Sequence, residues 1–375
     1  MAQTSISPRQ IRRPVRRNSA SLYMLIMLVS FSTSVVVTRL FLTLTGFPKI
    51  GRGEIHIAHL LWGGLLLFIA ATLLLVLANR WAYLTSAVCA GVGAGLFMDE
   101  VGKFITTSNN YFYPLAMPII YGFFLIIVLV YLQVRKPPKQ DSRSEMYRVL
   151  EMLPDLLDRE LEEHERQALE QRLKEISEQS DNQDLTRLAT ILRDFLASPI
   201  QIAPERPGFL NRLAKGLQQF EERWIGRERL KLILVVGMAI LGFLAIAELI
   251  VLLAAPKFPD MLAQSITHFA TTGEITGPNT FNWFLIQLAL EGTVGILLVI
   301  ASILLIVGED QRANELGYFG LLMSLTVVNL LLFYFDQFGN LLLTIIQIFL
   351  LAALVQYRQH YIFPQKTTTP VTAAT

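Results

Sequence analysis

Long apolar runs separated by short polar segments dominate the pattern of this chain. Eight runs hold roughly 20 mostly apolar residues each, the length that a helix needs to cross a hydrocarbon core of about 30 Å. They cover residues 22–45, 56–77, 81–98, 113–132, 230–254, 281–307, 316–335 and 338–357. The pattern therefore predicts an all-α polytopic integral membrane protein with about eight transmembrane helices.

The segment between the fourth and fifth runs is polar and interrupts this pattern. Within it, apolar residues recur at helical spacing over 161–176 and over 185–195, which predicts a small helical insert. A third amphipathic run, 207–227, carries arginines and lysines on its other faces. It fits an interfacial helix lying on anionic lipid, or a third helix of the insert.

The insert divides the predicted spans into two groups of four. The expected organisation is a basic cytoplasmic tail at 1–21, a first four-helix membrane half at 22–133, a cytoplasmic insert at 134–228, a second four-helix half at 229–358 and a C-terminal tail at 359–375. Five arginines lie in the first tail, and cytoplasmic flanks carry the Lys/Arg excess. We therefore expect both termini in the cytoplasm and the protein in the plasma membrane.

Composition agrees with this class and excludes others. Of the 375 residues, 53% are hydrophobic and 17% charged, against about 45–50% and about 25% in soluble proteins. A soluble enzyme and a disordered chain do not have this balance. Cys89 is the only cysteine, so an intrachain disulfide, an iron–sulfur cluster and a Cys-based zinc site are excluded.

The two membrane halves resemble each other in three places. The helix end 97–103 matches 334–340, with Asp and Gly at the same spacing, and the segment 64–71 matches 295–302. Arg39 and Glu248 are single deep charges in the first span of each half. These matches suggest a parallel repeat, an arrangement common among transporters. The alternative is that apolar helices resemble one another by chance and that Asp-x-x-Gly is a common helix end.

Ionisable side chains inside a membrane cost about 2.5–3.5 kcal/mol each to insert, so they are candidate functional residues. The candidates for a binding site or proton relay are Arg39, Asp99, Glu248, Glu291 and Asp336. They lie in the outer halves or at the outer ends of the predicted spans, so a polar cavity would open outward. Arg39 could pair with either Glu248 or Asp99.

Glu291 lies deepest of these residues and has no cationic partner of its own. Because an isolated carboxylate in a low dielectric is more stable when it is protonated, we predict a neutral Glu291. Its hydrogen-bond partner would be Gln287, Asn329 or Gln347. This carboxyl group serves either as hydrogen-bonding glue between helices or as a proton or cation site.

A metal site is a further hypothesis for the outer end of the first half. His56 and His59 are three residues apart and share one helical face, and Asp99 or Glu100 could complete a site of two His and one carboxylate. Consecutive helical residues point about 100° apart, so only one of the two carboxylates would serve. The simpler interpretation is that both histidines hydrogen-bond to neighbours or water, and no cofactor is then required.

Small residues precede Asp99 in the third span. Ala87, Gly91 and Gly95 recur at four-residue spacing, which lets two membrane helices approach closely. This stripe predicts tight packing of the third span against a neighbour, which would also hold Asp99 in place.

Three functions remain compatible with these features. The sequence favours a translocator or an ion- or proton-coupled membrane protein with an outward-facing cavity for an unidentified small molecule or ion. The alternatives are a membrane-embedded enzyme acting on a lipid-like substrate, and a receptor or scaffold whose insert binds a protein partner. The chain has no Walker loop, and the insert is slightly acidic, so ATP-driven transport and nucleic-acid binding are disfavoured.

Overall fold

The computed structural model describes residues 14–46, 58–111, 113–136, 141–157, 163–180, 182–197, 226–254, 278–335 and 340–362. The chain divides into two compact units. The first unit comprises Met1–Val101 and Phe123–Gly208, and the second comprises Gly102–Gly122 and Phe209–Thr375.

Eight helices in the described ranges are long and apolar enough to cross a membrane, which confirms the predicted fold class. The first four are α2 (Ala20–Thr45), α3 (His59–Val76), α4 (Arg80–Asp99) and α6 (Ala116–Arg135). The fifth and sixth are α11 (Arg227–Ala254) and α13 (Pro278–Val307), the seventh combines α14 (Asp310–Met323), η1 (Ser324–Val328) and α15 (Asn329–Phe335), and the eighth is α16 (Leu341–Tyr357) extended by η2 (Arg358–Ile362). The seventh span begins at Asp310, six residues before the predicted start.

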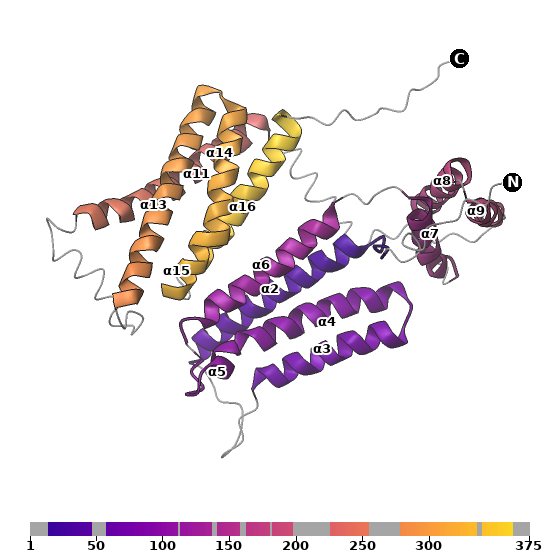
Figure 1. Cartoon of the computed structure of the whole chain (residues 1–375), viewed down its shortest axis with the longest axis horizontal. Coiled ribbons are helices and arrows are strands. Elements are labelled where there is room, and N and C mark those ends of the chain that lie inside the picture. The colour runs from indigo at the N-terminus through magenta and orange to yellow at the C-terminus, as the bar shows by residue number, and fades with distance from the viewer. Residues whose placement is uncertain are drawn as a thin grey trace. The chain divides into compact units, whose positions relative to one another are not determined.

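In the first unit, α4 packs against both α2 and α3 (Figure 1). Gly93 of α4 faces Gly63 of α3, and a Cβ atom on either glycine would lie 2.8 Å from the other's carbonyl oxygen. On the α2 side, a Cβ on Gly95 would lie 2.7 Å from the Cβ of Ser34, and Gly91 lies against the backbone of Met27. The predicted close approach along the small-residue stripe is therefore present, with α2 as the partner.

The insert is a bundle of three described helices, α7 (Ser142–Leu157), α8 (Glu163–Gln179) and α9 (Gln183–Leu196). Helices α8 and α9 confirm the two helical stretches expected from the sequence. Helix α7 was missed, although it supplies Met146 and Val149 to the same buried core as Leu173 of α8. The run 207–227 lies outside the described residues.

The second unit is held by a core that α11, α13, the seventh span and α16 share. Leu234 and Met238 of α11 lie in this core with Leu298 of α13, Leu321 of α14 and Leu354 of α16. All five side chains are almost completely buried. A short helix, α5 (Val101–Ile105), lies between α4 and α6 in the chain.

The packing of the described helices does not confirm the repeat. In the first unit the third span, α4, contacts both the first and the second, whereas in the second unit the second span, α13, contacts both the first and the third. The matched glycines also differ, because a Cβ on Gly64 would meet nothing within 4 Å, whereas a Cβ on Gly295 would lie 2.8 Å from the carbonyl oxygen of Gly242. The match of Asp99 with Asp336 cannot be compared, since Asp336 lies outside the described residues.

Candidate functional site

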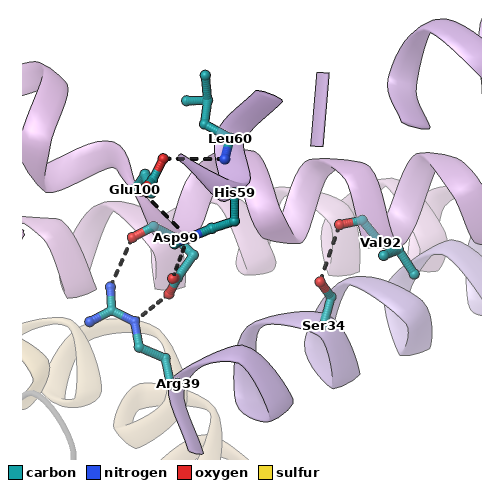
Figure 2. Close-up of polar contacts among 7 residues, drawn as sticks. All are labelled: Ser34, Arg39, His59, Leu60, Val92, Asp99 and Glu100. Atoms are coloured by element: carbon teal, nitrogen blue, oxygen red, sulfur yellow. Dashed lines mark hydrogen bonds and ion pairs between the residues drawn. The ribbon is translucent and has the colours of Figure 1, made fainter. Parts of the chain in front are cut away.

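The buried charges of the membrane helices in the first unit meet where α2, α3 and α4 come together (Figure 2). Asp99 is completely buried, and Arg39 is 4% exposed. The Nε of Arg39 donates to Oδ1 of Asp99, and its Nη2 donates to the backbone carbonyl oxygen of Asp99 at 3.0 Å. Of Glu248 and Asp99, the two partners expected for Arg39, Asp99 is the one that it contacts.

His59 links this pair to the surface. Its Nε2 lies 2.9 Å from Oδ2 of Asp99, and its Nδ1 lies 3.4 Å from Oε1 of Glu100. The side chain of His59 is 23% exposed, whereas both carboxylates are completely buried. Ionised carboxylates only accept hydrogen bonds, so both ring nitrogens can donate to them only when the imidazole is protonated. In that state Arg39 and His59 balance the two negative charges.

Asp99 and Glu100, whose carboxylates both contact His59, lie at the C-terminal end of α4. The helix ends at Asp99, and Glu100 is its C-cap with φ −91° and ψ 7°. The two carboxylates contact opposite nitrogens of the His59 ring. Glu100 Oε2 also accepts the backbone N–H of Leu60 at 3.2 Å, in the first turn of α3. A helix start has unpaired N–H groups and a positive dipole end, so this acid stabilises it.

The metal hypothesis gains no support from the described residues. No group of three or more His, Cys, Asp and Glu side chains among them could hold a metal ion. His56 lies outside the described residues, so the predicted pair of histidines cannot be compared. Both carboxylate oxygens of Asp99 already have partners in Arg39 and His59.

In the second unit, the structure places Glu291 beside Gln287 on α13. The Nε2 of Gln287 donates to Oε2 of Glu291 at 3.0 Å, so Gln287 is the partner chosen from the three that the sequence offered. Gln287 is 3% exposed, and its Oε1 has no hydrogen-bond partner among the described residues. Glu248 is exposed on α11. The protonation of Glu291 stays a prediction.

Asn329 and Gln347, the other two expected partners of Glu291, hydrogen-bond to each other instead. Asn329 Nδ2 donates to Thr344 Oγ1 at 3.0 Å and to Gln347 Oε1 at 2.8 Å. All three side chains are buried. This network is neutral, and it joins the seventh span to α16.

A π-helical segment, η1, lies immediately before Asn329 in the same span. The hydroxyl of Tyr121, at the start of α6, donates to the carbonyl oxygen of Leu325 within η1 at 2.5 Å. A π-helical turn interrupts the regular ladder of backbone hydrogen bonds and is often found at functional sites. The sequence analysis missed Tyr121 and Thr344, because apolar periodicity carries no signal for a π-helical turn.

Asp310 forms a third polar cluster at the start of α14. Its Oδ1 lies 3.1 Å from Nζ of Lys231, and its Oδ2 accepts from Arg227 at 3.0 Å and from the hydroxyl of Tyr357 at 2.7 Å. The contacts join α11, α14 and α16 at the end predicted to be cytoplasmic. Asp310 lies between the predicted spans 281–307 and 316–335, so this cluster was not among the predicted sites.

Comparison of the chain with protein-family models, curated proteins and solved structures found no match. Any functional assignment therefore rests on the geometry of these clusters.

Proposed function

We propose that this multi-pass membrane protein is a proton-coupled translocator and that His59, with Asp99 and Glu100, is its proton-binding element. The observation that carries the proposal is the position of the His59 ring between two completely buried carboxylates. In the proposed state the ring carries a proton on both nitrogens, and because the side chain is 23% exposed it can exchange the second proton with water. With the orientation that the basic tail predicts, this end of the first unit faces the outside of the cell.

The electrostatics of the cluster link protonation to structure. With His59 protonated, two positive and two negative side chains share the site. Loss of the proton removes one positive charge from beside Asp99 and Glu100, and one ring nitrogen of His59 then has no proton to donate. A net charge inside a low-dielectric environment is costly, so the cluster favours rearrangement when the proton leaves. Histidine changes charge between about pH 5 and pH 8, which suits this role.

The cost of the cluster supports a functional interpretation over a structural one. Charged residues in membrane helices are rare, pair with one another and mark ion pathways and proton relays. Helices α2, α3 and α4 already approach closely through their glycines, so their packing does not require ion pairs. Glu291, hydrogen-bonded to Gln287, is the candidate for a second proton position in the other unit.

The proposal is tested by electrical measurements on the reconstituted full-length protein. Proteoliposomes adsorbed on a solid-supported membrane are subjected to a pH jump between about pH 5 and pH 8, the interval in which histidine titrates. We expect a transient charge displacement with the natural protein and its loss with His59→Gln. His360→Gln is the matched control, because His360 is exposed on η2, where its Nδ1 lies 3.2 Å from the carbonyl oxygen of Gln356.

A second measurement asks whether the proton crosses the membrane. Vesicles that contain a trapped pH dye and carry an imposed membrane potential should acidify faster with the natural protein than with His59→Gln. Equal transients from the natural protein and His59→Gln would refute the assignment of His59. Equal acidification rates would refute translocation.

A further inference from the structure

A cavity of about 520 Å³ lies within the first unit, between the beginnings of α2 and α4 and the insert helices α7 and α8. Two ion pairs hold the insert against the membrane helices here. Arg17 Nη1 lies 3.2 Å from Oε1 of Glu151, and Arg80 Nη1 lies 2.9 Å from Oε1 of Glu165. None of Arg39, His59, Asp99 and Glu100 lines this cavity.

The lining of the cavity has an excess of positive charge. It contains four arginines, Arg16, Arg17, Arg80 and Arg148, against two acidic residues, Glu151 and Glu165. The two glutamates are engaged by Arg17 and Arg80. Arg148 is buried and pairs with Glu145. Arg16 forms no ion pair with any residue in the described part of the chain, so its charge is available to a ligand that lies in the cavity.

The position of the cavity indicates which anion it meets. Helices α2 and α4 both begin at this end, which the basic tail predicts to be cytoplasmic. Tyr23 and Tyr83 stack with ring centres 5.8 Å apart, and the guanidinium of Arg17 lies 4.0 Å from the Tyr83 ring centre. Tyrosines together with arginines at the ends of spans are typical of the headgroup layer of a bilayer. The cytoplasmic leaflet is rich in anionic lipids, which basic residues attract.

We propose that this cavity binds the phosphate-bearing headgroup of an anionic phospholipid, with Arg16 as its principal contact. The phosphate neutralises the excess charge of the lining. Arginine suits this role because its planar guanidinium makes two parallel hydrogen bonds to phosphate oxygens. The apolar side chains of Leu150 and Met152 at the same cavity fit the glycerol and upper acyl region of a lipid.

The test uses the full-length protein purified in a neutral detergent and stripped of lipid. Dioctanoyl phosphatidylglycerol is titrated while the thermal unfolding midpoint is recorded, because a ligand that binds the folded state raises this midpoint. Dioctanoyl phosphatidylcholine and inorganic phosphate are titrated in parallel. We expect phosphatidylglycerol to stabilise the protein and Arg16→Gln to weaken its apparent affinity about fivefold.

Arg312→Gln is the matched control, because Arg312 is a highly exposed arginine whose ion pair within the described residues is with Glu309, three positions earlier. It should leave the affinity for phosphatidylglycerol unchanged. Equal stabilisation by phosphatidylcholine, or equal weakening by Arg16→Gln and Arg312→Gln, would overturn the proposal. Stabilisation by inorganic phosphate that also depends on Arg16 would support a phosphate site but overturn its assignment to lipid.

Discussion

The two membrane regions differ in the kind of polar side chains that they bury between their helices. In the first unit, the polar interior is charged, with Arg39 and Asp99 buried as an ion pair beside His59. In the second unit, the buried network of Asn329, Thr344 and Gln347 is neutral, and the ion pairs of Asp310 lie at one end of the helices. A neutral network costs little to bury, whereas a buried ion pair is costly unless both partners stay in place.

Under the proposed function, His59 responds to protons, whereas the network around Asn329 holds two helices together. The amide and hydroxyl groups around Asn329 do not titrate. Arg39 and His59, by contrast, both contact the carboxylate of Asp99, and His59 also contacts Glu100. We therefore expect the first unit to be much more sensitive to conservative changes at its polar positions than the second.

The largest effect should follow Asp99→Asn. This change keeps the shape of the side chain but removes the negative charge that pairs with the buried Arg39, which should cost about 3–5 kcal/mol. The matched change in the second unit, Asn329→Leu, removes two hydrogen bonds of about 0.6 kcal/mol each. Unfolding in mixed detergent micelles measures both. The comparison fails if Asp99→Asn costs no more than Asn329→Leu.

An intermediate effect should come from the glycine contacts, in which the two units are alike. Gly93 faces Gly63 in the first unit, and Gly242 faces Gly295 in the second. A Cβ added to Gly93 or Gly242 would lie 2.8 Å from the carbonyl oxygen of the facing glycine. Gly93→Ala and Gly242→Ala should each cost about 1–3 kcal/mol in the same unfolding measurement.

Gly64→Ala is the control for these two variants, because a Cβ at Gly64 meets nothing within 4 Å. It should leave the stability unchanged. A neutral Gly93→Ala alongside a costly Gly242→Ala would show that close backbone approach is a property of the second unit alone.

The smallest effect should follow Tyr121→Phe. The change removes the hydroxyl that donates to the Leu325 carbonyl oxygen in η1, at a cost of about 0.6 kcal/mol and at most about 1.7 kcal/mol. Tyr131→Phe, on the same helix, is the control for loss of a hydroxyl from α6. If the two variants have equal stability, the hydrogen bond to η1 contributes nothing to the second unit.

The sequence predicted the membrane class, the eight spans and two of the three described insert helices. These features depend on local apolar patterns, and the length and periodicity of such patterns are properties of the chain itself. The same reasoning missed α7, in which the buried residues Met146 and Val149 lie among charged residues. It also singled out Arg39 and Asp99, because a charge within an apolar run is visible in the sequence.

What the sequence could not decide was which groups meet. Arg39 had two candidate partners, and only the packing of α2 against α4 selects Asp99. The sequence predicted the end of the third span at residue 98, one residue before α4 ends, but it did not indicate that Glu100 contacts His59 and Leu60. Pairing between residues far apart in the chain depends on helix packing and on where each helix ends. Apolar periodicity determines which segments cross the membrane, whereas the contacts between them exist only once the helices have packed.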